Sequence, residues 1–377
     1  HSNVQGATDI PTLFADLPNY IPLPKVAEGN ATLKDYLANG HGFSGARNKT
    51  DGMWKLETER GSWASLPNYM VSLLKAWYGD YAMKENEYGF QWLPKLGGNE
   101  SLTVTIERAK KGEVDGLLVF GQNIAVTNPN TGWGRTAIRN LKWLVVCDLF
   151  ENETASVWYA DPNGPKPSEV QTEVFYLPTN SCLEKDGSVS NTERLMQWHE
   201  APGECRSDAW WTYQLGKRLK ALAETSGLPR DEGLRSLTWS YDMPQGKQNE
   251  MGLPPIEGDC DLDAVAYEMN GFDMVTGKPI QGSGELKSDG TTACGCRLLA
   301  GFINEAGENL TKRRDGGTVD HELDLTYRFA WPTNSRILYN RCSAAPDGKP
   351  WSERKKLVWW DEIEQKWVGY DKPQFDA

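Results

Sequence analysis

The sequence lacks several features on which common functional assignments depend. In 377 residues no apolar run approaches the roughly 18 residues that a transmembrane helix needs. No G-x-S-x-G motif occurs, which excludes the nucleophile elbow of an α/β-hydrolase. Histidine is scarce, and no two histidines are spaced as metal ligands usually are; they are His1, His41, His199 and His321.

Positive charge and paired cysteines are also in short supply. The chain has 40 Lys and Arg against 52 Asp and Glu, a net charge of −12, so we expect no nucleic-acid partner. None of the seven cysteines shows C-x2-C spacing, which excludes a zinc ribbon or an iron–sulfur motif here. The chain opens on His1-Ser2-Asn3 with no initiator methionine or targeting pattern, so we expect a piece of a longer, processed or divided protein.

The clearest pattern that is present lies between residues 114 and 148. An apolar run at 117–120 is followed by a polar loop and by GRTAIRNL at 134–141, whose apolar residues have helical spacing. A second apolar run, WLVVC, occupies 143–147. Strand, loop, helix and strand in this order predict a βαβ unit, with a parallel sheet covered on both faces.

Ligands of such sheets bind beyond the carboxyl ends of the strands. We therefore expect Gly121, Gln122, Asn123 and Asp148 to lie at a binding edge. Asp148 follows Gly121 by 27 positions, near the ~20 at which dinucleotide-binding folds place a ribose-binding carboxylate. GQN is not G-x-G-x-x-G, and an α/β layer without a ligand is the alternative interpretation.

Further elements extend this unit. The predicted fold is α/β: a Rossmann-like parallel sheet with helices on both faces in residues 1–228, then an irregular, loop-rich α+β extension in 229–377. The other predicted elements are helices at 66–81, 103–111 and 209–225, the last with Asp208 as N-cap, a third strand at 172–177, and a hairpin in the tail at 355–375.

The long polar loop after the third strand carries the remaining chemistry. Lys185 lies in a charged run, EKDGSVSNTER, and can meet a phosphate as a point charge. The carboxylate of Asp208 presents two acceptors side by side, which suits the adjacent N–H donors of guanine. The alternatives are a solvated surface loop for the run and a simple helix cap for Asp208.

Five stretches of the chain resemble the large catalytic subunit of formate dehydrogenases. The most specific is E-K-D-G-S-x-x-N-x-E-R followed by A-P-G-E-x-x-S-D, and the similarity is closest to the periplasmic, membrane-linked type of the molybdopterin oxidoreductase superfamily. The opening HSNVQGATD resembles the same family, just after its active-site arginine. The stretches are GQN at 121–123, VVCDLFENETASVWY at 145–159, the segment 172–211, DGTTACGC at 289–296 and RILYNRCSAAPDGKPW at 336–351.

The resemblance implies a molybdenum or tungsten atom held by two molybdopterin guanine dinucleotides, with formate oxidised to CO2. It places the dinucleotide contacts on this chain; the predicted set is Gly121, Gln122, Asn123, Cys147, Asp148, Lys185, Asn191 and Asp208. The family's cluster-binding cysteines, its selenocysteine or cysteine metal ligand with the following histidine, and its arginine are absent from this sequence. We therefore expect no catalytic residue and no metal ligand in the chain, and no activity from it alone.

The family also implies partners. These are the remainder of the catalytic subunit with its 4Fe-4S cluster, an iron–sulfur (beta) subunit, and a cytochrome subunit as a further candidate, in the periplasm and membrane-associated through those subunits. Two alternatives stay open: a cofactor-less electron-transfer scaffold of the same fold, and another molybdopterin oxidoreductase such as a nitrate reductase. Lys185, Asn191 and Asp208 together argue against the scaffold, because an empty site gains nothing from buried polar groups.

Overall fold

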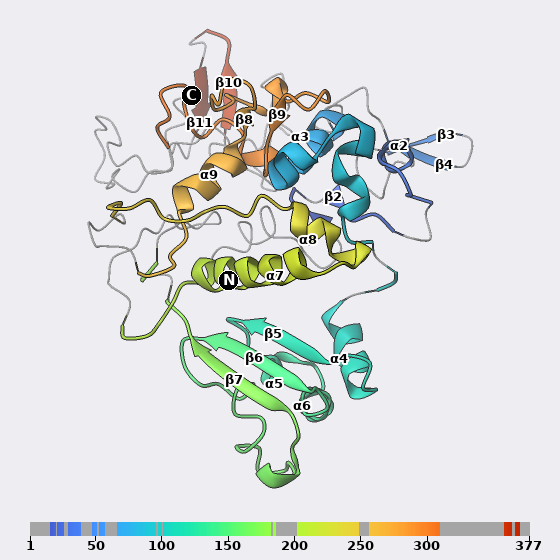
Figure 1. The fold of residues 1–377 in the computed structure, drawn as a ribbon, viewed down its shortest axis with the longest axis vertical. Coiled ribbons are helices and arrows are strands. Elements are labelled where there is room, and N and C mark those ends of the chain that lie inside the picture. Colours follow the sequence, from blue (N-terminus) through green and yellow to red (C-terminus); the bar gives the residue numbers. More distant parts are fainter. Residues whose placement is uncertain are drawn as a thin grey trace.

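Three parallel strands form the sheet that carries the predicted binding edge (Figure 1). They are β5 (Gly116–Phe120), β6 (Trp143–Asp148) and β7 (Glu173–Pro178), adjacent in that order. The predicted α/β class, with a parallel sheet followed by a loop-rich region, is confirmed. The computed structural model describes residues 16–19, 21–25, 29–38, 47–50, 53–56, 66–95, 97–99, 101–181, 184–185, 202–248, 256–309, 358–363 and 366–369.

One face of the sheet is closed by helices. The cover comes from α4 (Leu102–Lys110), α5 (Ile124–Thr127) and α6 (Thr131–Ile138). Ile138 of α6 and Leu144 of β6 are fully buried in the cluster between these layers. Apolar residues at helical spacing meet apolar strand residues here, and their removal from water stabilises the unit.

The opposite face is less completely covered. Leu118, Val145 and Phe175 are in register across the three strands, so their side chains lie on this same face. Leu118 is 47% exposed and Phe175 is 45% exposed. On the face that α4 and α6 cover, by contrast, Leu144 and Val146 of the central strand are fully buried.

A second hydrophobic cluster joins distant parts of the sequence. Its centre is α3 (Leu66–Tyr78), whose Leu73 and Leu74 are fully buried. The Oγ of Ser72 lies 2.8 Å from the Oγ1 of Thr292 in β9 (Thr292–Ala293). Residues between 17 and 93 thus share one core with residues between 280 and 294.

The remaining elements are mostly short. In Figure 1, α7 (Asp208–Thr225) lies between the sheet and the part of the molecule that holds α3. The predicted tail hairpin is confirmed by β10 (Val358–Asp361) and β11 (Lys366–Gly369), which pair antiparallel. The other described elements are β1 (Asp16–Leu17), β2 (Ile21–Pro22), α2 (Leu33–Ala38), β3 (Arg47–Thr50), β4 (Met53–Leu56), η3 (Gly79–Tyr81), η4 (Lys84–Trp92), η5 (Pro167–Glu169), η6 (Pro229–Asp231), α8 (Glu232–Ser236), α9 (Leu262–Asn270), β8 (Phe272–Asp273), η7 (Ser283–Glu285) and η8 (Arg297–Leu299).

The predicted helices are confirmed, with small shifts at their ends. The helix expected over 66–81 is α3 followed by the 3₁₀ turn η3, which begins at Gly79 with φ +51°. The helix expected over 103–111 is α4. No described helix is long and apolar enough to span a bilayer. The division into domains near residue 229 stays a prediction.

Candidate functional site

The carboxyl ends of the three strands bring the predicted residues to one edge. The N–H of Gly121 donates to the carbonyl of Cys147 at 2.9 Å, just beyond the end of β5. The N–H of Thr179 donates to the carbonyl of Asp148 at 3.0 Å, just beyond the end of β7. Gly121 has φ +58°, a conformation that glycine adopts at no steric cost, and here it turns the chain away from the sheet.

Asn123 and Asp148 are both held by the turn that follows β6. The Oδ1 of Asn123 accepts from the hydroxyl of Thr154 at 3.0 Å, and its Nδ2 donates to Glu153 at 2.5 Å. One oxygen of Asp148 accepts from the Nδ2 of Asn152 at 2.6 Å, and the other accepts from the N–H of Leu149 at 2.7 Å. A ligand at this edge would therefore share or replace existing hydrogen bonds.

Gln122 and Cys147 differ in exposure. The side chain of Gln122 is exposed at the edge. Cys147 is 1% exposed, and burial raises the pKa of its thiol to about 11, with the nearby carboxylates of Asp208 and Asp148 adding to the shift. The thiol is thus protonated at neutral pH, and carboxylates from two different elements, β6 and α7, act on it.

A short strand-like contact brings Asp208 to this edge. Arg206 forms a parallel bridge with Thr179, its N–H donating to the carbonyl of Pro178 at 3.3 Å. Asp208 follows two residues later as the first residue of α7. The chain therefore returns to the sheet beside β7.

The prediction that Asp208 is the N-cap of its helix is wrong. Ser207 is the N-cap: its Oγ accepts from the N–H of Trp210 at 3.1 Å. Ser and Asp are adjacent in the sequence and both cap helices well, so the sequence alone did not separate them. The carboxylate of Asp208 is consequently not used as a cap.

Lys185 and Asp208 form an ion pair. The Nζ of Lys185 lies 2.5 Å from the Oδ2 of Asp208, and the two side chains are 30% and 50% exposed. The structure thus joins two residues that lie 23 positions apart in the sequence. Asn191, the other predicted contact from this loop, lies outside the described residues.

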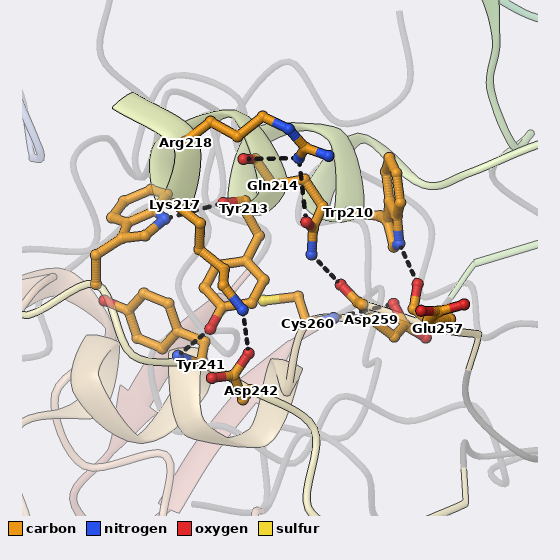
Figure 2. A network of polar contacts seen from close by, with 12 residues as sticks. Trp210, Tyr213, Gln214, Lys217, Arg218, Tyr241, Asp242, Glu257, Asp259 and Cys260 are labelled. Atoms are coloured by element: carbon orange, nitrogen blue, oxygen red, sulfur yellow. Dashed lines mark hydrogen bonds and ion pairs between the residues drawn. The ribbon is translucent and has the colours of Figure 1, made fainter. Parts of the chain in front are cut away.

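Contacts along α7 fix the position of its first turn (Figure 2). The Nε1 of Trp210 donates to the carbonyl of Glu257 at 3.0 Å, and the Nε2 of Gln214 donates to the carbonyl of Gly258 at 2.6 Å. The Nζ of Lys217 lies 2.7 Å from Asp242. Because these contacts run along the helix, Asp208 is presented from an anchored element.

Two polar atoms near this edge escaped the sequence interpretation. The Oδ1 of Asn180 and the Nε1 of Trp211 are buried and have no hydrogen-bond partner. In the sequence, Asn180 belongs to a Pro-Thr-Asn segment typical of any loop, and Trp211 is typical of a buried helix position. Neither residue is therefore indicated as a binding residue by its neighbours. Within the described ranges, no group of three or more His, Cys, Asp or Glu side chains could hold a metal ion.

The geometry described above is that of an α/β protein whose polar residues gather at the carboxyl edge of a parallel sheet. No family model matches the chain. An alignment of 383 positions covers all of this chain and gives 33% identity to the nitrate-inducible formate dehydrogenase major subunit of Escherichia coli (strain K12). The chain is 32% identical over 378 residues, 97% of this chain, to the formate dehydrogenase 2 subunit alpha (cytochrome c-553) of Nitratidesulfovibrio vulgaris.

Over essentially its whole length the chain is similar to a segment of formate dehydrogenase major (alpha) subunits. It spans about a third of those relatives, 36% and 35% of the two just named. A more partial match, 32% identity over 175 residues, is to the assimilatory nitrate reductase catalytic subunit of Bacillus subtilis (strain 168), with 46% of this chain and 21% of that protein covered.

Proposed function

We propose that this chain is the dinucleotide-holding part of a formate dehydrogenase catalytic subunit. Its carboxyl sheet edge would bind a guanine dinucleotide of a molybdopterin cofactor. When bound, that cofactor supplies, through Mo or W, the two-electron oxidation of formate to CO2. The chain's own residues would hold and orient the dinucleotide; they are Gly121, Gln122, Asn123, Cys147, Asp148, Lys185, Asn191 and Asp208.

The residues of the edge fit such a group. Asn180 has a buried acceptor and Trp211 a buried donor, both without partners, and a nucleotide carries groups of both kinds. The cation of Lys185 suits a phosphate, and the carboxylate of Asp208 suits paired N–H donors. The thiol of Cys147 is buried and protonated, so it adds no charge beside the dinucleotide.

The observation that carries the proposal is the position of Asp208. It lies at the carboxyl edge of a parallel sheet, is half exposed, and does not serve as its helix cap. A carboxylate placed there is available to accept from a ligand, and Ser207 already satisfies the helix end.

A comparison of two neighbouring substitutions tests the proposal. Asp208→Asn should lower the guanine nucleotide released on denaturation of the purified enzyme, because one acceptor becomes a donor; hydrogen bonds to charged groups are worth roughly 1.5–3 kcal/mol. Ser207→Ala should lower helix stability by about 0.5–2 kcal/mol and leave nucleotide content unchanged. Normal nucleotide content in the Asp208→Asn enzyme would refute the proposal.

The proposal extends to partners and location. The remainder of the catalytic subunit would supply a 4Fe-4S cluster and the metal ligand, with electrons passing to an iron–sulfur subunit and, where present, a cytochrome subunit in the periplasm. The relatives' names as major and alpha subunits support further subunits.

A second candidate keeps the cofactor and changes the substrate to nitrate. The partial match to a nitrate reductase catalytic subunit favours it. The two candidates separate by assay: formate-dependent dye reduction supports the first, whereas reduced-dye oxidation by nitrate supports the second.

A further inference from the structure

The side chain of Asn180 is incompletely satisfied. The residue follows the end of β7 and is 7% exposed. Its Nδ2 donates to the carbonyl of Glu184 at 2.8 Å, and its N–H donates to the carbonyl of Arg206 at 3.2 Å. Its Oδ1 is buried without a partner. Buried amide oxygens are nearly always hydrogen-bonded, so this oxygen points to a donor on a bound molecule.

Asn180 is also linked to the Lys185–Asp208 ion pair through residues next to it in the sequence. Glu184, which accepts from the Asn180 amide, immediately precedes Lys185, and Lys185 reaches Asp208 at 2.5 Å. Arg206, which accepts from the Asn180 N–H, lies two residues before Asp208. The unsatisfied oxygen and the ion pair therefore flank the same short segment of the sheet edge.

Trp211 adds a donor to this neighbourhood. It lies in the first turn of α7, three residues after Asp208, and its indole N–H is buried without a partner. The end of β7 thus carries a buried acceptor, and the first turn of α7 carries a buried donor. The diphosphate bridge of a dinucleotide has acceptors only at neutral pH, so this group by itself would leave the Asn180 oxygen unsatisfied. A nucleotide, with N–H and hydroxyl donors beside carbonyl and phosphate acceptors, can satisfy both.

We propose that Asn180 is a nucleotide-binding residue whose Oδ1 accepts a hydrogen bond from the guanine base or from its ribose. The inference rests on the proposed function and adds to the predicted set a residue with no local sequence signal. Asn180 binds through its oxygen and holds Glu184 through its nitrogen, so the two roles can be separated by substitution.

Three substitutions in the purified enzyme separate them. Asn180→Asp keeps an acceptor oxygen and loses the donor to Glu184, whereas Asn180→Ala loses both. Asn128→Ala is the matched control: Asn128 is also 7% exposed and its Nδ2 donates to the carbonyl of Ile124, four residues away, at 2.9 Å. All three should lower the melting temperature. Only Asn180→Ala should also lose guanine nucleotide, with about tenfold weaker retention.

Added nucleotides identify the donor. The melting temperature of cofactor-stripped enzyme is measured with GDP, with IDP, which lacks the 2-amino group, and with 2′-deoxy-GDP, which lacks the 2′-hydroxyl. If GDP raises the melting temperature and IDP does not, the donor to Asn180 is the 2-amino group. If 2′-deoxy-GDP does not, the donor is the ribose 2′-hydroxyl. Equal shifts with all three, reduced in Asn180→Ala, assign the donor to the N1–H of guanine or the 3′-hydroxyl of the ribose.

The outcomes are distinct for the two proposals. Wild-type enzyme that releases no guanine nucleotide and gains no stability from GDP would overturn both. Wild-type enzyme that holds guanine, with Asn180→Ala holding as much as Asn128→Ala, would overturn the role of Asn180 and leave the proposed function intact. Equal nucleotide loss in Asn180→Asp and Asn180→Ala would show that Asn180 acts only through its contact with Glu184.

Discussion

The ammonium of Lys185 lies 2.5 Å from the carboxylate of Asp208, with both side chains partly open to solvent. An exposed pair of this kind contributes little to folding because water and salt screen it and two side chains lose freedom. The pair is therefore better placed to present two charges to a ligand than to stabilise the fold.

A double-mutant cycle should show this small contribution. Lys185→Met, Asp208→Asn and the double variant are unfolded with urea, and we expect a coupling energy below about 1 kcal/mol. Each single substitution should lower the guanine nucleotide content of the enzyme more than its change in stability explains. A coupling energy of several kcal/mol, with normal nucleotide content, would instead assign the pair a structural role.

The thiol of Cys147 should be unreactive in the folded protein. Burial raises the pKa of this thiol to about 11, from 9.0, and the carboxylates of Asp208 and Asp148 reinforce the shift. Because the unfolded thiol ionises first, its contribution to the free energy of unfolding is present below pH 9 and falls between pH 9 and about 11. Mass spectrometry after iodoacetamide treatment near neutral pH should find Cys147 unmodified in folded protein and modified in urea. Rapid modification of the folded protein would contradict the burial described here.

Stability should fall as pH rises through the titration of Glu268. Burial raises the pKa of this carboxyl from 4.5 to about 7, opposed by the hydroxyl of Tyr241, which donates to it at 2.6 Å. Between these values the unfolded chain has released its proton and the folded protein has kept it, so the free energy of unfolding falls with pH, by up to about 3 kcal/mol. Urea unfolding at a series of pH values measures it. Glu268→Gln should flatten this part of the profile, and an unchanged profile would assign the dependence to other groups.

Two leucines on opposite faces of the sheet should differ sharply. Leu144 is fully buried beneath α4 and α6, whereas Leu118 is 47% exposed on the other face. Leu144→Ala should cost about 2–5 kcal/mol through lost burial and a cavity, and Leu118→Ala should cost far less. Equal losses in urea unfolding would mean that the second face is covered in the protein as purified.

The strands and long helices were predictable because their signals are local. Apolar runs end at Gly121 and Pro178, and α3 carries its buried residues at helical spacing. The meeting of Gly121 and Asp148 at one edge followed from parallel topology. The family resemblance carried the assignment of Lys185, whose neighbours in the sequence are those of any charged loop.

The rest depended on tertiary contacts that no local pattern encodes. Ser207 and Asp208 are equivalent caps by propensity, and only the side-chain geometry decides between them. Asn180 is held at the sheet edge because Arg206, 26 residues later, pairs with its neighbour Thr179 and accepts from its backbone N–H. No periodicity or residue spacing in the sequence indicates the cap at Ser207 or the contact of Asn180 with Arg206.

The core around α3 also sets an order in which the chain can fold during synthesis. Ser72 meets Thr292 across 220 residues, and the hydroxyl of Tyr69 donates to the carbonyl of Gly295 across 226. At about 5–20 residues per second a ribosome needs roughly 10–45 s to make the second partner after the first. The β5–β7 unit, whose strands lie within residues 116–178, is complete long before that. The sheet would therefore form first, and the apolar face of α3 would stay exposed to water until its distant partners are made.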